Sequence, residues 1–394
     1  MDVDRAAASL GGARHDVDGS ACVVIDRAWK PDQWHGRQRV GAYALEPAAP
    51  IAMLDPRLTL DPDWTDGVVF FDIETTGLSG GAGTLPLLVG CGWFEEKTFT
   101  VRQFFLSGPA GERALLSGLS EILDRASLLV TYNGRTFDVP VMETRWAYHR
   151  KENGAEGVPH FDMLPIARRL WGGMRGREDE ARVPCTLTSI ERSVLRFHRV
   201  DDVPGLEIPS RYFQFLRTGD STAIEGVLDH NRHDILSLAA ITAHALRLAG
   251  EGPDACETAT EQMGLGRLYE RAGDLARAEH AYARAAASEE TDLAAHALAR
   301  LAVLLRRQSR HQEAADAWHG VLSLSSERSL FAALERQAAE ALAIHHEHRA
   351  RELGAARRYA ETLRRHANGS RAAQADRRMT RLDGKLKKAG GLLE

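Results

Sequence analysis

The most constraining feature of the chain is an apolar segment that ends in two acidic residues, Val-Val-Phe-Phe-Asp-Ile-Glu-Thr-Thr-Gly at positions 68–77. Branched and aromatic residues of this kind predict a buried strand. Residues two apart in a strand point to the same face, so Asp72 and Glu74 converge. Side by side they repel, which raises a pKa unless a cation sits between them. Because Mg2+ and Mn2+ take carboxylate oxygens, the segment predicts a metal site of the kind that two-metal nucleases use.

The segments around this strand predict an α/β domain at residues 66–250. Strands expected at 68–73, 87–94 and 99–105 are close enough together to form an antiparallel meander. A helix at 111–125 then leads to an apolar strand at 128–132. Further helices are expected at 139–150, 163–171, 187–195, 210–217 and 223–249, and a polar, Gly-rich loop at 172–182. We therefore predict a mixed sheet flanked by helices.

The two ends of the chain differ from this central part. Residues 1–65 are rich in Asp, Pro, Ala and Gly and predict a partly ordered leader. At 255–394 the composition shifts to Ala, Arg, Leu and Glu with helical periodicity, which predicts an all-α domain. Small and large residues there alternate as in a tetratricopeptide unit: Leu265, Gly266, Tyr269, Gly273, Ala278, Tyr282 and Ala285, with weaker copies at Ala314/Trp318 and Ala355/Tyr359. Two or three tetratricopeptide-like hairpins that bind a protein partner or guide the substrate are expected.

Composition excludes several classes of protein. No apolar run approaches the roughly 20 residues needed to cross a bilayer, and the first residues lack a signal-peptide core, so a cytoplasmic location is expected. The four cysteines form no Cys-x-x-Cys pair, which disfavours a zinc knuckle. The net charge of −5 argues against binding nucleic acid over the whole surface. Residues 349–394, with thirteen Lys/Arg against five Asp/Glu, would either follow a phosphate backbone or form a solvated helical face.

Two later segments supply further acidic residues. Asp138 follows an apolar strand and the turn Asn133-Gly134, where it would be either a helix cap or a ligand at the carboxyl edge of a sheet. His230 and Asp234 are four residues apart on a predicted helix and share a face. Such a pair would be either a surface contact or part of a site.

In this order and context, Asp72, Glu74, Asp138 and Asp234 resemble the acidic residues of the DEDD (DnaQ-like) exonucleases in the ribonuclease-H-like superfamily. A closer resemblance is to the YprB-like family, whose blocks match the segments at 71–81, 133–138, 200–205 and 230–238. The resemblance covers roughly residues 65–250, and family members often carry tetratricopeptide-like repeats behind the nuclease domain. It implies that the four acidic residues hold two Mg2+ or Mn2+ ions across a scissile phosphate.

The resemblance also bears on the general base. The superfamily uses a Tyr four residues before the last Asp or a His five before it, whereas this chain has His230 and Asp229 at those positions. We expect His230 to act as the base, with His233 as the alternative. Four further residues are candidate substrate contacts: Thr75, Thr76, Asn133 and Asp162. The alternative for Asn133 is that it only makes the turn, and the alternatives for Asp162 are an outer ligand of the metal or the cap of the helix at 163–171.

The predicted function is a metal-dependent nuclease that removes nucleotides from the 3′ end of single-stranded DNA or RNA. One alternative is a non-catalytic nucleic-acid-binding or scaffold protein, which the retention of four mutually repelling carboxylates disfavours. The other is an endonuclease of ribonuclease H type, because the same fold supports internal cleavage.

Overall fold

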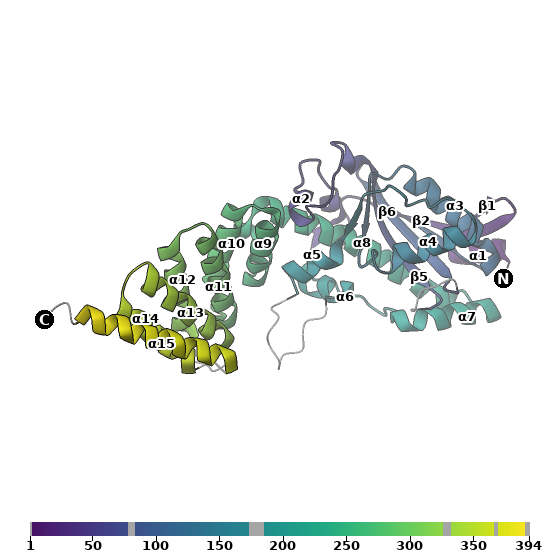
Figure 1. Ribbon diagram of the computed structural model, residues 1–394. Helices are drawn as coiled ribbons and strands as arrows, with labels where there is room; N and C mark the ends of the chain where they lie inside the picture. Colours follow the sequence, from purple (N-terminus) through teal and green to yellow (C-terminus); the bar gives the residue numbers. More distant parts are fainter. Residues whose placement is uncertain (1, 78–82, 173–184, 326–331, 366–368, 391–394) are drawn as a thin grey trace. The chain divides into compact units, whose positions relative to one another are not determined.

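A computed structural model describes residues 2–77, 83–172, 185–325, 332–365 and 369–390. The chain divides into two compact units, with the division between Gly250 and Glu251 (Figure 1). The loop predicted at 172–182 lies almost wholly outside the described residues. Among the described helices, none combines the length and the apolar character needed to span a bilayer.

A seven-stranded mixed sheet organises the first unit, in the order β1-β2-β7-β6-β5-β8-β9. The strands are β1 Ala13–Val17, β2 Ser20–Trp29, β5 Val68–Thr75, β6 Pro86–Glu95, β7 Thr98–Phe105, β8 Leu128–Thr131 and β9 His160–Asp162. A separate two-stranded ribbon pairs β3 Trp34–His35 with β4 Gln38–Arg39. β5, β6 and β7 form the predicted antiparallel meander, and β8 and β9 extend the sheet in parallel beyond β5. The carboxyl ends of β5, β8 and β9 therefore meet at one edge.

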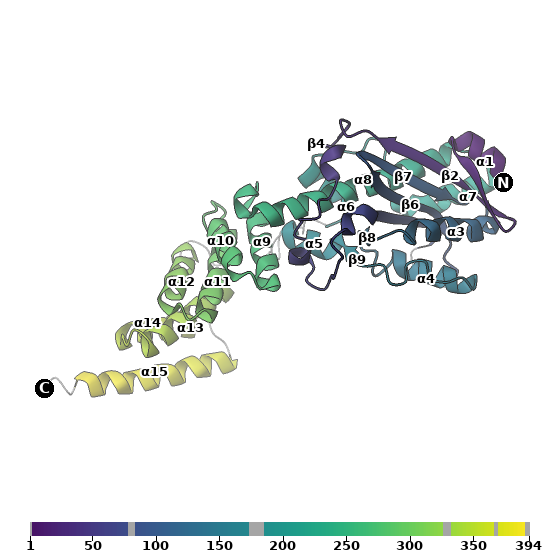
Figure 2. The same ribbon diagram turned by 90° about the horizontal axis from the view of Figure 1, so that it is seen from above.

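The helices of this unit lie on both faces of the sheet (Figures 1 and 2). Their bounds are α1 Val3–Leu10, α2 Ile51–Leu54, α3 Glu112–Leu123, α4 Asp138–Tyr148, α5 Met163–Leu170, α6 Leu187–Ile190, α7 Ile208–Thr218 and α8 Thr222–Glu251. Its short 3-10 turns are η1 Val40–Tyr43, η2 Trp64–Gly67, η3 Pro109–Gly111 and η5 Gly205–Glu207, and η4 Glu191–Leu195 is a π-helical turn. The 3-10 turn η6 Pro253–Ala255 belongs to the second unit. Helices α3 and α4 pack on one face, and α1, α7 and α8 pack on the other.

The prediction of a partly ordered leader at 1–65 is wrong. Strand β2 pairs with β7 from Val23↔Phe105 to Trp29↔Phe99, and β1 then pairs with β2. Helix α1 adds Leu10 to the core that it shares with α7 and α8. The apolar stretch 21–25 is too short to predict a central strand by itself, because its pairing partner lies about 80 residues further along the chain.

The second unit is all-helical, as predicted. Its helices are α9 Ala259–Ala272, α10 Leu275–Ala286, α11 Thr291–Arg307, α12 His311–Ser325, α13 Ala332–His348, α14 Leu353–Arg365 and α15 Gly369–Gly390. Gly266 in α9 lies directly against the ring of Tyr282 in α10, which is the small-against-large contact that the repeat pattern requires. Trp318 is buried in a similar cluster between α11, α12 and α13. Membership of the tetratricopeptide class remains a prediction.

The basic C-terminal stretch uses several of its charges within the fold. Glu347 on α13 accepts hydrogen bonds from Arg381 at 2.7 Å and from Lys385 at 2.8 Å. Helices α14 and α15 are further joined by the ion pairs Arg357–Asp383 and Arg364–Asp376. These ion pairs favour the structural interpretation of the stretch over a continuous phosphate-binding track.

Candidate metal centre

Strand β5 places Asp72 and Glu74 on the face of the sheet that α8 covers. The alternate residues Val69, Phe71 and Ile73 enter the core beneath α3 and α4. Because side chains alternate along a strand, the two carboxylates point the opposite way. The shared face predicted for Asp72 and Glu74 is therefore the face on which the helix with the last acidic residue lies.

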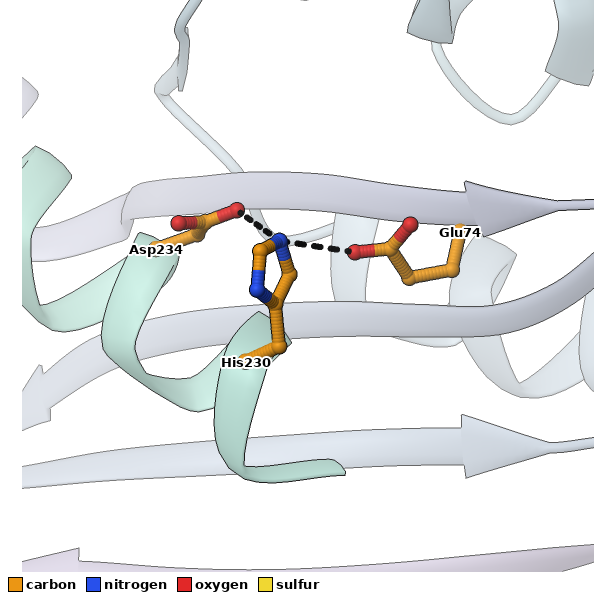
Figure 3. Close-up of side chains that lie close together, drawn as sticks. All are labelled: Glu74, His230 and Asp234. Carbon is orange, nitrogen blue, oxygen red and sulfur yellow. Dashed lines mark ion pairs between the residues drawn. The ribbon is translucent and has the colours of Figure 1, made fainter. Parts of the chain in front are cut away.

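Helix α8 contributes His230 and Asp234, one turn apart. Figure 3 shows the imidazole ring of His230 directed between the carboxylates of Glu74 and Asp234. His230 Nε2 lies 3.7 Å from Glu74 Oε1 and 3.5 Å from Asp234 Oδ2. Within the described part of the chain, these three residues form the His/Cys/Asp/Glu group whose ligand atoms all lie within 4.8 Å of one another. Each side chain is 14% exposed, so an ion can reach them from solvent.

Asp138 is the first residue of α4 and faces the same cluster. Its carboxylate accepts a hydrogen bond from the backbone N–H of Ile73, which ties the start of α4 to β5. Burial, together with the charges of Asp162 and Asp234, raises the pKa of Asp138 to about 7. Asp138 does not belong to the group formed by Glu74, His230 and Asp234, but the charge of Asp234 still raises the pKa of its carboxyl group.

The carboxylates of β5 are crowded in the same way. Burial, followed by the charges of Asp234, Glu74 and Asp138, raises the pKa of Asp72 well above its ordinary value. Burial and the charges of Asp234 and Asp138 likewise raise the pKa of Glu74. The structure thus brings all four predicted acidic residues to one place, where they interact unfavourably as anions.

Asn231 is a site residue that the sequence did not reveal. Its Nδ2 donates to Asp72 Oδ2 at 2.8 Å, and its Oδ1 accepts from Gln103 Nε2 at 2.8 Å. The bridge passes over Gly90, which lies between Asp72 and Gln103 in the sheet register. A Cβ at Gly90 would overlap the Asn231 side chain. The signals available in the sequence were a glycine inside one predicted strand and a glutamine inside the next, and the structure buries that glutamine fully.

Arg199 supplies the positive charge at the cluster and was also missed. The guanidinium forms an ion pair with Asp234 Oδ1, and it donates to Glu191 at 2.5 Å and 2.9 Å. The Arg199 side chain is only 3% exposed and that of Glu191 only 1%. Next to it, Asp202 Oδ1 lies 2.8 Å from His230 Nδ1. Asp202 belongs to the segment 200–205, which resembles the YprB-like family in sequence, but the resemblance assigned no role to this residue.

The four predicted substrate contacts hold the local backbone together. The Thr75 hydroxyl donates to the carbonyl of Gly77, and Thr76 Oγ1 accepts from the N–H of Leu85. Asn133 is exposed in a left-handed conformation with φ of 71°. Asp162 caps α5 by accepting from the backbone N–H groups of Leu164, Asn133 and Arg135. Asn133 Oδ1 also accepts from Thr136 Oγ1 at 2.9 Å. These bonds favour the turn alternative for Asn133 and the cap alternative for Asp162.

The alternative base His233 lies in a different environment from His230. Its ring contacts Phe197 at a centroid distance of 5.3 Å and stacks near His35 at 6.4 Å. Burial lowers the pKa of His233 to about 4. The structure therefore favours His230 over His233 as the functional histidine.

The set of donor atoms fits a divalent cation. Four carboxylates and one imidazole lie beside the buried guanidinium of Arg199, and burial together with the neighbouring negative charges raises the pKa values of three of the carboxylates. Hard divalent ions bind oxygen ligands of this type and would remove the repulsion.

Sequence comparison with known proteins agrees with this fold. Residues 69–246 match the sequence profile of the RNase H superfamily. The uncharacterized protein YprB of Bacillus subtilis (strain 168) is 31% identical over 314 residues, which cover 75% of this chain and 68% of YprB. A family B DNA polymerase from the hyperthermophilic archaeon Pyrobaculum calidifontis is 14% identical with a TM-score of 0.37, over 55% of this chain and 29% of the polymerase. The extent of the match to YprB and the superfamily profile together show that the chain belongs to the YprB-like family of the RNase H superfamily.

Proposed function

We propose that this protein is a metal-dependent nuclease that hydrolyses phosphodiester bonds, acting as a 3′-5′ exonuclease on single-stranded DNA or RNA in the cytoplasm. The observation that carries the proposal is the convergence of Asp72, Glu74, Asp138 and Asp234 on one face of the sheet. Maintaining four repelling carboxylates costs stability, and a purely structural site has no use for them. Membership of the RNase H superfamily supports the same conclusion.

The four carboxylates would hold two Mg2+ or Mn2+ ions. When bound, such ions stabilise negative charge on the phosphate and on the leaving oxygen, and they lower the pKa of water. The protein itself supplies orientation. Asn231 fixes one oxygen of Asp72, and Arg199 fixes one oxygen of Asp234, so each carboxylate presents its other oxygen to the site.

A basic pocket beside edge strand β9 supports a nucleic-acid substrate. It is lined by Arg57, Leu58, Thr59, Arg135, Pro159 and His160. Both arginines contact the carboxylate of Asp55, with Arg57 at 2.8 Å and Arg135 at 3.4 Å, so the group keeps one excess positive charge. Arg135 lies in the connection between β8 and α4, and Asp138 is the first residue of α4. The excess positive charge suits a phosphate group of a bound strand.

The helical unit is proposed as a tetratricopeptide-like module that binds a protein partner or guides the strand. Its consecutive helices bury one another's apolar residues, as in stacked repeats.

The test is nucleotide release from labelled single strands by the full chain, with Mn2+ or Mg2+ and with a chelator. Substrates blocked at the 3′ or the 5′ end decide the polarity, and a circular strand detects internal cleavage. Asp72→Asn should abolish release without loss of fold, because the amide preserves the shape of the side chain and removes a charge. Absence of metal-dependent turnover on every DNA and RNA substrate would contradict the proposal in favour of a binding or scaffold role.

A further inference from the structure

We propose that His230 is a metal ligand rather than the general base, and that Glu74, His230 and Asp234 form a site that prefers Mn2+ to Mg2+. This inference deepens the proposed function and concerns the same cluster. It differs from the four-carboxylate ligand set that the sequence resemblance implies, because it adds a nitrogen donor.

The first step is the tautomer of His230. Its Nδ1 has two neighbours, Asp202 Oδ1 at 2.8 Å and Arg199 Nη1 at 3.3 Å. A carboxylate can only accept, whereas a guanidinium can only donate, so the two contacts require opposite states of Nδ1. The contact with Asp202 is shorter by 0.5 Å and therefore dominates. Nδ1 then carries a hydrogen, which leaves Nε2 as the ring atom that can donate a lone pair to a cation.

The second step is the direction of that lone pair. Nε2 faces Glu74 Oε1 at 3.7 Å and Asp234 Oδ2 at 3.5 Å, as Figure 3 shows. Both separations are too long for a strong hydrogen bond. They are shorter than the span of two metal–ligand bonds of about 2.0–2.2 Å each. A cation held by both carboxylates would therefore contact Nε2. The ion would then occupy the position from which a general base takes its proton.

The third step is the support behind each ligand. Asp202 orients His230, and Arg199 occupies Asp234 Oδ1 while leaving Oδ2 toward the cluster. Arg199 is itself fixed by the buried Glu191. A carboxylate that receives the second N–H of a histidine is the usual outer partner of a metal-bound imidazole.

The ligand set predicts which ion is preferred. Mg2+ is bound almost entirely through oxygen and keeps its waters, whereas Mn2+, a first-row transition metal, accepts an imidazole nitrogen beside carboxylate ligands more readily than Mg2+ does. Among the two ions expected for this site, Mn2+ gains more from a nitrogen donor. Removing the imidazole should therefore weaken Mn2+ more than Mg2+.

Pulsed electron paramagnetic resonance tests the ligand directly. The full chain, freed of metal by a chelator and labelled with 15N-histidine, is loaded with Mn2+ and examined for 15N hyperfine coupling. We expect coupling in the wild type and its loss in His230→Ala. The exposed His198, which lies next to Arg199 in the chain, provides the control His198→Ala, in which the coupling should persist.

Metal affinity provides the second readout. Loss of an outer partner typically costs about 10- to 100-fold in metal affinity, so His230→Ala should weaken Mn2+ at least about tenfold and Mg2+ by a smaller factor. Asp202→Ala should weaken Mn2+ in the same direction. Circular dichroism checks that each variant is folded.

The two roles of His230 give opposite results. A wild type without 15N coupling, or a His230→Ala variant that binds Mn2+ normally but has lost cleavage, would overturn the ligand assignment and restore the general base. Failure of the nuclease proposal looks different, because coupling in a protein that cleaves no substrate supports the ligand assignment and contradicts only the activity.

Discussion

Replacing Asp138 with asparagine should stabilise the metal-free protein at neutral and alkaline pH. Asp138 is buried, and its pKa rises from 3.8 to about 7 because of burial and neighbouring carboxylates. The folded state therefore holds a proton that the unfolded state releases, and wild-type stability falls as pH rises from 3.8 through about 7. The rise of the Asp138 pKa from 3.8 to about 7 corresponds to a loss of about 4 kcal/mol in the free energy of unfolding. Asparagine keeps an oxygen for the N–H of Ile73 and carries no charge.

The gain from Asp138→Asn should thus be small near pH 4 and approach about 4 kcal/mol, as an upper limit, at pH 8. Urea unfolding with a chelator present, followed by tryptophan fluorescence, measures this difference. Six of the seven tryptophans precede Gly250, so the signal reports on the unit that holds the site.

Mn2+ should reverse the order of stability, because the ion stabilises the wild type and the variant has lost a ligand. A variant that is no more stable than the wild type at pH 8 with chelator, or whose gain is independent of pH, would refute the view that Asp138 is held as a repelled carboxylate.

Three further changes test other parts of the arrangement. Gly90→Ala should cost about 1–3 kcal/mol and weaken metal binding, because the new methyl group displaces Asn231. Arg199→Met should cost about 3–5 kcal/mol by denaturant unfolding, since it leaves a buried carboxylate without its partner. The double change Arg57→Ala and Arg135→Ala should weaken oligonucleotide binding and reduce its salt dependence by about one to two phosphate contacts, measured by fluorescence anisotropy.

Matched controls make these results specific. Gly205→Ala adds a methyl group where nothing lies within 4 Å, so it should leave stability unchanged. Arg217→Ala removes an exposed arginine of α7 and should leave the salt dependence of binding unchanged. Equal effects in a variant and its control would show that the named contact is not responsible. For Arg199→Met, an unfolding free energy within about 0.5 kcal/mol of the wild type would contradict the buried-charge argument.

The sequence predicted those features that depend on local patterns. Strand β5 follows from the apolar run at 68–73, and the shared face of its carboxylates follows from the period of a strand. Helix α8 follows from helical periodicity over 223–249. The pairing of β2 with β7 could not be predicted in this way, because a short apolar stretch becomes a central strand only when a distant partner is present.

The support of the site depends on contacts between distant segments. Asn231 matters because Gly90 lets α8 approach β6, and Gln103 on the next strand then fixes the orientation of its amide. Each of these residues is unremarkable in its own segment. Arg199 likewise belongs to no local motif, because its partners Glu191 and Asp234 lie 8 and 35 residues away in the chain.

A His/Asp pair four residues apart is ambiguous in the sequence. In the structure its position is fixed, because helix α8 both packs against the sheet and carries the pair. Asn231 and Ile235 form the buried stripe that packs over Gly90 and Gly92, and this contact fixes the rotation of the helix. His230 and Asp234 each precede one member of that stripe, so they lie at its margin, where the sheet face ends and solvent begins. Packing of this buried stripe therefore sets where the ligands point, and any change that rotates α8 should alter metal binding before it alters the fold.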